Sequence, residues 1–499
     1  MQRVPMRPAD IGQVVVVEEV DAAADGSIAV VVRRIVRRGG YESHLYVVDL
    51  TRRAVPRRLT TGRVRDTWPR VSPDGRRVAF IRSWVDDDDR PAALCIVPVA
   101  GGRIRAVVPR GSTPGFGSVE ELAWSPDGSR LAFVAAVDPS RFVVGERPAI
   151  GTRAARSPKL PSPTARRIVR ADWRWDESGH RDHWSHLFVV GSDGGPAPRR
   201  VTAGDFGVSA ITWHPDGRTV TFQADLGDEP DLRPCTSIWA VDVDAGPRSR
   251  RSRPRRLLST GAPVTKPAFS PDGRWLAAIG SLVPDPLDDV SPGLLLIRSD
   301  GSGEPLQLSG GLDRSIGNWT DTDLHGWMAH GRPGPAWLDD STIVATLTDR
   351  GRCLPERWML DPSSGASTDG PRVSDRSAPG PWADVAVHQL AVAPAAPADR
   401  RIVVLGTLDG RAMDVMTVDL SAPAGERGFR HHSTFGSAWQ RRFEQPEMRR
   451  IDVPGPGGPI ETWVTSPPGV GDAMLPTIVD VHGGPLGGWA PAPHIEVTM

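Results

Sequence analysis

A stretch of four residues, His482-Gly483-Gly484-Pro485, has the residue types and the order of a turn that can support chemistry. The apolar run before it, residues 477–481, predicts a short buried β-strand that ends directly in this turn. Adjacent glycines permit positive φ and a close approach of the backbone to a ligand, while proline stiffens the exit. A backbone N–H in such a turn can stabilise the negative oxygen of acyl transfer. The alternative is an ordinary Gly-Gly turn that ends a strand.

Composition limits the classes of protein that the chain can form. Its 499 residues favour two or three domains, and 60 basic against 60 acidic residues give a pI near 7.2. This balance predicts no general affinity for nucleic acid or for an anionic membrane. The three cysteines, Cys95, Cys235 and Cys353, lie far apart without a Cys-x-x-Cys motif, so neither a metal site nor a disulfide framework is predicted. We find no signal-peptide pattern and no membrane-length apolar run, and therefore expect a soluble cytoplasmic protein. We also expect no cofactor.

An internal repeat dominates the first part of the chain. A tight turn recurs four times, and its proline, aspartate and glycine each favour the turn conformation for a separate reason. The copies are Ser72-Pro73-Asp74-Gly75, Ser125-Pro126-Asp127-Gly128, His214-Pro215-Asp216-Gly217 and Ser270-Pro271-Asp272-Gly273. A short apolar strand follows each turn. A second phrase recurs upstream of three of the turns, as Arg58-Leu59-Thr60, Arg200-Val201-Thr202 and Arg256-Leu257-Leu258.

The repeat predicts stacked antiparallel β-units. Weaker copies near residues 25, 339 and 399 bring the number of units to seven, each of about 50 residues. This spacing favours a mainly β fold with a seven-bladed β-propeller over residues 1–444, and the alternative is a long β-sandwich. Residues 138–170, rich in arginine, proline and serine, are predicted to form a loop insertion.

Three charged segments are predicted to be solvated surface. Residues 86–89 lack the alternating spacing of a calcium-binding loop. The arginine-rich residues 248–256 lack interleaved aromatic residues, so we expect the tip of a hairpin rather than a nucleic-acid site. Glu120 and Glu121 form an acidic pair before one of the turns, for which we also expect a solvated face.

A different pattern begins near residue 445. Residues 448–453 and 460–464, separated by a glycine-rich turn, predict a β-hairpin, and the strand that ends at His482 follows. We therefore predict a second domain over residues 445–499.

This order of elements resembles the prolyl oligopeptidase family of serine peptidases. The resemblance is carried by seven units with Ser-Pro-Asp-Gly turns, a hairpin, and a strand that ends in His-Gly-Gly-Pro. The segment from Arg170-Ala171-Asp172-Trp173-Arg174-Trp175 to His186-Leu187-Phe188-Val189-Val190 is similar to the mid-propeller segment of the acylaminoacyl-peptidase and dipeptidyl-peptidase-like branch. The likeness covers essentially the whole chain and implies that residues 445–499 begin an α/β-hydrolase domain.

The resemblance also implies a mechanism, a substrate class and site residues. In such enzymes the propeller admits short peptides, a serine attacks the scissile carbonyl, and a histidine oriented by an aspartate transfers the proton. The implied oxyanion-hole donor is the N–H of Gly484, with His482, Gly483 and Pro485 shaping the turn. His482 is not expected to be the general base, because that histidine follows the serine in chain order.

The sequence departs from the family in one respect. It contains no Gly-x-Ser-x-Gly and thus no complete triad, so we expect a truncated chain that does not hydrolyse peptides by itself. We also expect the residues beyond 444 to be poorly ordered or exposed. The family peptidase role, a catalytically silent peptide-binding or scaffold propeller, and an unrelated propeller with a chance His-Gly-Gly-Pro remain open. Oligomeric state and the choice between endo-, dipeptidyl- and acylaminoacyl-cleavage stay open as well.

Overall fold

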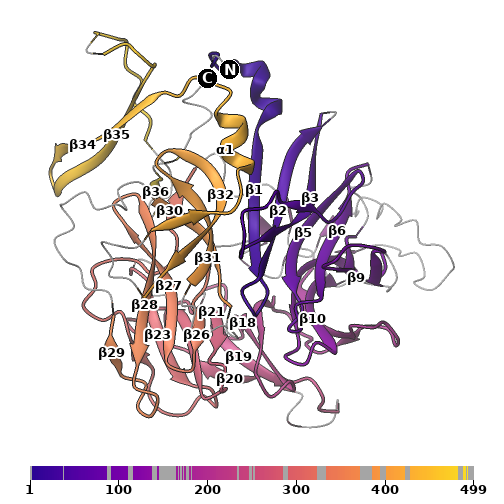
Figure 1. The fold of residues 1–499 in the computed structure, drawn as a ribbon. Coiled ribbons are helices and arrows are strands. Elements are labelled where there is room, and N and C mark those ends of the chain that lie inside the picture. Colours follow the sequence, from indigo (N-terminus) through magenta and orange to yellow (C-terminus); the bar gives the residue numbers. More distant parts are fainter. Residues whose placement is uncertain are drawn as a thin grey trace.

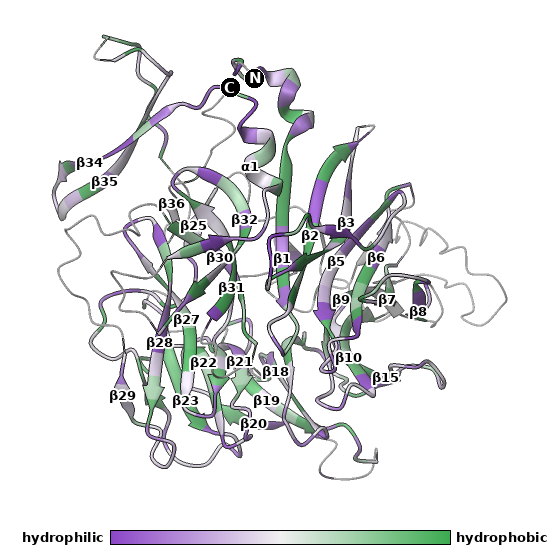
Figure 2. Cartoon of the chain, viewed as in Figure 1, coloured by the Kyte–Doolittle hydropathy of each residue, from purple (hydrophilic) through white to green (hydrophobic). Residues whose placement is uncertain are grey.

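The computed structural model of the chain describes most of its residues. These are 3–37, 39–86, 91–110, 116–137, 143–144, 165–166, 168, 171, 173–175, 179–180, 183–232, 235–246, 250, 253–284, 290–322, 333–370, 385–393, 401–421, 428–471, 473–481, 487–490 and 492. The described part is mainly β, and Figure 2 shows apolar stretches along many of its strands. The predicted insertion, residues 138–170, falls mostly outside the described residues.

The first two units form one eight-stranded sheet. Its strands are β1 (Val15–Ala22), β2 (Ile28–Arg37), β3 (Gly40–Asp49), β4 (Arg57–Arg58), β5 (Val64–Val71), β6 (Arg77–Trp84), β7 (Ala93–Pro98) and β8 (Arg105–Val108). Strands β1 to β4 and β5 to β8 are two antiparallel meanders, and a single parallel pair, Ser43 with Arg65, joins them.

Three four-stranded sheets follow, each with sequential antiparallel neighbours. The first contains β9 (Phe116–Trp124), β10 (Arg130–Val137), β15 (Ser185–Gly191) and β16 (Arg199–Arg200). The second contains β17 (Ser209–Trp213), β18 (Thr219–Ala224), β19 (Ser237–Asp242) and β20 (Arg255–Leu258). The third contains β21 (Thr265–Phe269), β22 (Trp275–Gly280), β23 (Gly293–Arg298) and β24 (Leu306–Gln307). Two small hairpins, β11 (Val143–Val144) with β12 (Ala165–Arg166) and β13 (Arg174–Trp175) with β14 (Gly179–His180), lie between β10 and β15 in sequence.

A second eight-stranded sheet again contains two units. They are β26 (Ala336–Asp339), β27 (Thr342–Asp349), β28 (Arg352–Leu360) and β29 (Ser367–Asp369), then β30 (Val385–Ala391), β31 (Arg401–Leu408), β32 (Arg411–Asp419) and β33 (Phe429–His431). The remaining elements are a 3-10 helix at Pro8–Gln13, helix α1 (Phe435–Gln440), a hairpin of β34 (Glu447–Gly455) and β35 (Gly458–Ser466), and a parallel pair of β25 (Thr320–Asp321) and β36 (Gly488–Trp489).

The first strands of most neighbouring units lie against one another. Strand β5 contacts β9, β9 contacts β17, β17 contacts β21, and β21 contacts β26. Strand β1 contacts both β5 and β30, so the first unit in sequence lies between the second unit and the last (Figure 1). An apolar cluster joins β1 and β2 to β31, β32 and α1, and the indole nitrogen of Trp439 in α1 donates to the carbonyl of Val15 at 3.1 Å.

The predicted turns are confirmed. Gly75, Gly128, Gly217 and Gly273 all have φ between 67° and 72°, the left-handed region that glycine adopts without strain. In the turn at Ser125 the side chain of Asp127 accepts the backbone N–H of Ser129 at 3.0 Å, and hydrogen bonds led by that from Ser125 lower the pKa of Asp127 to about 2.

The turns also connect consecutive units. Arg77, just after one turn, donates to the carbonyl of Gly128 in the next turn at 3.0 Å, and Arg130 repeats this contact with the carbonyl of Gly217. A tryptophan before the turn forms a second bond to the preceding unit. These bonds run from Trp124 Nε1 to the Arg70 carbonyl at 2.9 Å, from Trp213 to Ala123 at 3.2 Å and from Trp337 to Ala268 at 3.0 Å.

The second repeated motif, at residues 58–60, 200–202 and 256–258, also has a structural role. The hydroxyl of Thr60 accepts the N–H of Leu45 at 2.9 Å, and the hydroxyl of Thr202 accepts that of Leu187 at 3.0 Å. Each hydroxyl therefore satisfies a buried strand N–H where the outermost strand separates from its neighbour. The third copy ends in Leu258, which has no hydroxyl and pairs with Ile238 in the sheet instead.

Candidate functional site

The predicted oxyanion turn, His482, Gly483, Gly484 and Pro485, lies outside the described residues. The predicted strand before it is not formed: residues 477–481 pair with no strand of the described part and are exposed, with Ile478 at 94%. An apolar strand of this kind becomes buried only when strands pair with its edges and other elements, such as helices, cover both of its faces. The hairpin at 448–464 is confirmed as β34 and β35, and its residues are mostly exposed.

The residues just after the turn, unlike those before it, pair with a strand and are partly buried. Gly488 and Trp489 form β36, and the side chains of Ala490 and Ala492 are buried against Cys353 and Ala386. The expectation that everything beyond residue 444 is exposed is therefore wrong for this segment. The chain returns to the sheets directly after the predicted site.

A second group of candidate residues lies on the first strands of the units. Four of these strands carry a residue other than glycine with positive φ: Glu19 at 48°, Trp68 at 54°, Ala210 at 49° and Lys266 at 54°. Each lies where the strand register shifts, as in a β-bulge. A bulge removes backbone N–H groups from the ladder, so these groups need other acceptors.

Carboxylates of the neighbouring first strand supply the acceptors. Glu19 accepts the N–H of Trp68 at 2.6 Å, and Asp21 accepts the N–H of Val71 at 2.7 Å. The two oxygens of Glu121 accept the N–H groups of Ala210 and Ile211, both at 2.8 Å. The prediction of a solvated face is therefore wrong for Glu121, because the long-range bulge could not be inferred from its local sequence. Glu120 is exposed, as predicted.

These carboxylates share their surroundings with two cations. Burial raises the pKa of Glu19 to about 7 against the opposing charge of Arg70, and it raises the pKa of Asp21, also near Arg70. Burial also raises the pKa of Glu121 and lowers that of Lys266, while the attraction between these two charges opposes both shifts. The first strands thus carry a cluster of mixed charge.

Glu18, next to Glu19 in sequence, is expected to make the stability of the fold depend on pH. Burial raises its pKa to about 8 although Arg34 lies 3.0 Å away, and its Oε1 atom has no partner among the described residues. Because the folded pKa lies above the unfolded value, the stabilisation is complete below about pH 4.5 and is lost as the pH rises through 8. We expect the melting temperature to fall between pH 6.5 and pH 8.5, and Glu18→Gln to flatten this fall.

The matched control is Asp452→Asn on the exposed strand β34. Thermal unfolding of both variants and the parent chain across this pH range measures the effect. The expected loss of folding free energy by pH 8.5, relative to pH 6.5, is roughly 2 kcal/mol. An equally steep fall in Glu18→Gln would show that Glu18 is ionised in the folded chain.

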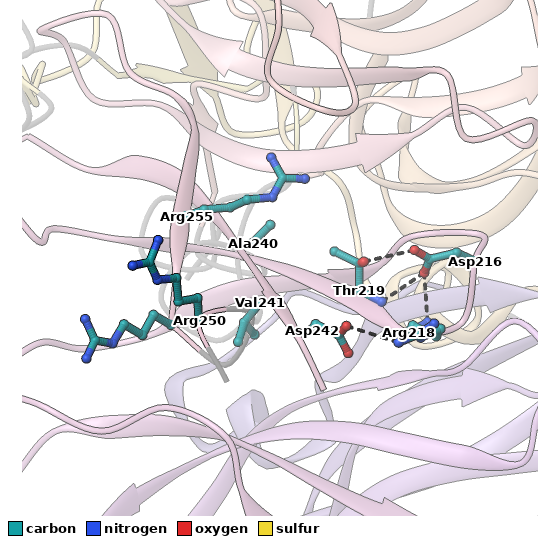
Figure 3. A pocket seen from close by; sticks show the side chains of 9 residues that line it. Asp216, Arg218, Thr219, Ala240, Val241, Asp242, Arg250 and Arg255 are labelled. Atoms are coloured by element: carbon teal, nitrogen blue, oxygen red, sulfur yellow. Dashed lines mark hydrogen bonds and ion pairs between the residues drawn. The ribbon is translucent and has the colours of Figure 1, made fainter. Parts of the chain in front are cut away.

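A separate groove lies on the outer part of the unit that contains β18, β19 and β20. It has a volume of about 430 Å³, and Figure 3 shows its charged lining. Arg218 pairs with Asp242 at 3.3 Å, and Arg255 donates to the carbonyl of Asp300 at 2.8 Å. Figure 1 shows β20 at the end of the molecule opposite β34 and β35. Arg250, Arg253 and Arg255 are exposed, as predicted for the basic hairpin tip.

The described residues give little support to metal-ion or thiol chemistry. No group of three or more histidine, cysteine, aspartate or glutamate side chains in that part could hold a metal ion. Burial raises the pKa of the Cys95 thiol to about 12, which keeps it protonated and a poor nucleophile. No helix of the described residues is both long and apolar enough to cross a membrane.

Known proteins resemble this chain in part of its sequence and in most of its fold. No family model matches the chain. Over an alignment of 229 residues, this chain is 28% identical to the uncharacterized peptidase YuxL of Bacillus subtilis, and the alignment covers 44% of this chain and 31% of that protein. The structure of an acylaminoacyl peptidase in complex with Z-Gly-Gly-Phe-chloromethyl ketone superimposes on 99% of this chain with a TM-score of 0.67 and 14% identity. The resemblance to the prolyl oligopeptidase family is confirmed.

The likeness in fold covers nearly the whole chain, but the chain spans only 65% of that acylaminoacyl peptidase. The β-propeller domain of the trilobed protease from Pyrococcus furiosus, described as having an open velcro topology, matches 85% of this chain and 97% of its own length, with a TM-score of 0.51 and 12% identity. The likeness in fold therefore includes a β-propeller domain.

Two features of this prolyl oligopeptidase-like chain were missed from the sequence. The tryptophans before the turns were visible as Trp124, Trp213 and Trp337, and their recurrence at one position was the available signal. Residues 316–322, of which 320–321 pair with β36, contain no repeat and no motif that would indicate their role.

Proposed function

We propose that this chain is the propeller and the beginning of the hydrolase domain of a serine peptidase of the prolyl oligopeptidase family that hydrolyses short peptides. The observation that carries the proposal is the likeness to an acylaminoacyl peptidase over 99% of the chain. That structure contains a peptide-like inhibitor with a reactive ketone, and the 28% identity to a peptidase over 229 residues adds independent support. The domain boundary is proposed near residue 445, between α1 and β34.

Each eight-stranded sheet contains two four-stranded units and each four-stranded sheet contains one. These seven units are proposed to be the blades of a propeller. The contacts of β1 with both β5 and β30 support a closed ring, because they bring the first and last units together. In the described sheets all four strands of the first and of the last unit come from one continuous stretch each. The ring would therefore be closed without a shared strand. The apolar cluster around Trp439 and the main-chain hydrogen bonds of Val4 with Arg442 and Glu444 support this closure.

Catalysis is proposed to be divided between this chain and residues outside it. Gly484 would supply one oxyanion-hole N–H, and His482, Gly483 and Pro485 would shape its turn. The nucleophile, its base and the orienting acid would come from residues outside these 499, because no Gly-x-Ser-x-Gly occurs among them. The propeller would admit short peptides to this site. We also propose a cytoplasmic location, which the three free cysteines support.

A fluorophosphonate probe tests this proposal, since it modifies activated serines. We expect no labelling of the purified 499-residue chain and clear labelling of any longer product of the same gene that contains a Gly-x-Ser-x-Gly. A Ser→Ala variant at that motif is the control and should abolish the labelling. Labelling of the 499-residue chain itself would refute the proposed division of the catalytic residues.

A catalytically silent peptide-binding propeller is the second candidate. The mixed-charge cluster around Arg70, Glu121 and Lys266 favours it, because these groups belong to the described sheets and need no further domain. A gene without any downstream Gly-x-Ser-x-Gly, together with binding of unlabelled short peptides to the purified chain, would favour this role over the peptidase.

A further inference from the structure

Residues 316–322 form a largely buried segment that packs against β27 of the β26–β29 unit. Gly317 donates its N–H to the carbonyl of Thr346 at 2.7 Å, and Trp319 donates its N–H to the hydroxyl of Thr348 at 3.0 Å. The buried side chain of Asn318 accepts the N–H of Thr320 at 2.8 Å and contacts Nδ1 of the buried His388 at 3.0 Å. The segment is therefore fixed to two consecutive units, because His388 belongs to β30.

This fixed segment presents a strand edge to the tail. Residues 320–321 pair in parallel with residues 488–489, and the N–H of Gly488 donates to the carbonyl of Trp319 at 3.0 Å. Figure 2 shows β25 and β36 side by side near β30. Adding a short strand to an existing edge is a common way to bind an extended segment, since main-chain bonds hold it without special side chains.

The turn between β27 and β28 provides the second contact. A Cβ atom at Gly351 would lie 2.9 Å from the carbonyl oxygen of Trp489 and 3.4 Å from Nε1 of Trp463 in β35. The turn therefore touches both the hairpin and the tail. Gly351 also has a φ of +67°, so both its conformation and its surroundings require glycine.

The docked residues lie close in sequence to the predicted oxyanion turn. The exposed residues 473–481 come before the predicted oxyanion turn, and the docked residues 487–490 come directly after it. The tail is thus fixed to the sheets within a few residues of Gly484.

We propose that residues 316–322 and the turn at Arg350-Gly351, here called the platform, are a positioning surface that binds residues 487–490 and so fixes the oxyanion turn relative to the propeller. The catalytic meaning of this surface rests on the proposed function, whereas the docking itself does not. The platform residues are positioning residues, because they contact residues 488–489 and act on the turn only through them. Their loss therefore acts on the chemical step rather than on substrate binding.

The structure offers a closely matched pair of variants. Arg350-Gly351 and Asp409-Gly410 are both two-residue hairpin turns, with φ of 51° and 67° in the first and 52° and 67° in the second. Gly351→Ala and Gly410→Ala thus add the same backbone strain. Only the first places a Cβ against the tail, because the nearest atom to a Cβ at Gly410 is the methyl carbon of Met448 at 4.0 Å.

Amide hydrogen exchange on the 499-residue chain measures the docking. In the parent chain and in Gly410→Ala we expect residues 488–490 to exchange at least about tenfold more slowly than residues 478–481, and in Gly351→Ala we expect this difference to vanish. Gly488→Pro, which removes the donor, should have the same effect with both turns intact. Gly488→Ala should not, since its Cβ would meet nothing within 4 Å. Equal exchange of the two segments in the parent chain would overturn the proposal.

The positioning role is measured in a longer product that the fluorophosphonate probe labels. Gly351→Ala should lower kcat at least about tenfold with little change in KM, and Gly410→Ala should change neither. An unchanged kcat in Gly351→Ala, with docking lost, would show that the platform does not position the turn. If no product is labelled, the proposed function fails while the exchange result still decides the docking.

Discussion

Replacing Asp66 by alanine should destabilise the folded chain by about 3–5 kcal/mol, because a buried charge would lose its partner. Asp66 on β5 has no exposed side-chain surface, and it accepts two hydrogen bonds from Arg82 on β6, at 2.7 Å and 2.8 Å. Removing the carboxylate leaves the guanidinium of Arg82 largely buried without its counter-charge. Urea unfolding of the variant and the parent chain gives the difference in free energy.

The control for this prediction is a pair with the same chemistry at the surface. Arg63 donates to both oxygens of Asp86 at 2.7 Å, but the side chain of Asp86 is 66% exposed. Asp86→Ala should cost less than about 1 kcal/mol, because water solvates both partners once they separate. Similar costs for Asp66→Ala and Asp86→Ala would contradict the account of the buried pair.

The second large effect is expected at Trp213. This side chain is buried at the junction of two units, donates to the carbonyl of Ala123, and lies under Arg130, whose guanidinium is 5.2 Å from the ring centre. Trp213→Ala should cost about 3–5 kcal/mol, since it removes a large buried ring and leaves a cavity.

A conservative variant separates packing from hydrogen bonding at this position. Trp213→Phe keeps most of the ring and loses only the N–H, so we expect a cost of about 1 kcal/mol. The chain already uses this residue type in the next unit, where Phe269 precedes the turn and packs edge-on against His214 at 4.7 Å. If Trp213→Phe is as destabilising as Trp213→Ala in thermal unfolding, the indole hydrogen bond is the dominant contribution.

Features governed by local chemistry could be predicted from the sequence. The turns at Gly75, Gly128, Gly217 and Gly273 formed where proline, aspartate and glycine coincide, because these residues favour a turn whatever surrounds them. The hairpin at 447–466 formed for the same reason, around its glycine-rich turn.

Features governed by distant partners could not be predicted. The run at 477–481 is apolar enough for a buried strand, but burial depends on neighbouring strands that its own residues cannot supply. Glu121 was expected on a solvated face because nothing near it in sequence reveals the bulge at Ala210. The platform was missed since its contacts, such as Gly317 with Thr346 and Asn318 with His388, join segments far apart in the chain.

A crystal structure of the 499-residue chain would test the central claim, which is that consecutive β-units close into a ring carrying the start of a hydrolase domain. We predict density in which β1 lies between β5 and β30, with the indole of Trp439 bonded to the carbonyl of Val15. Two stacked sheets with β1 and β30 far apart would contradict the claim.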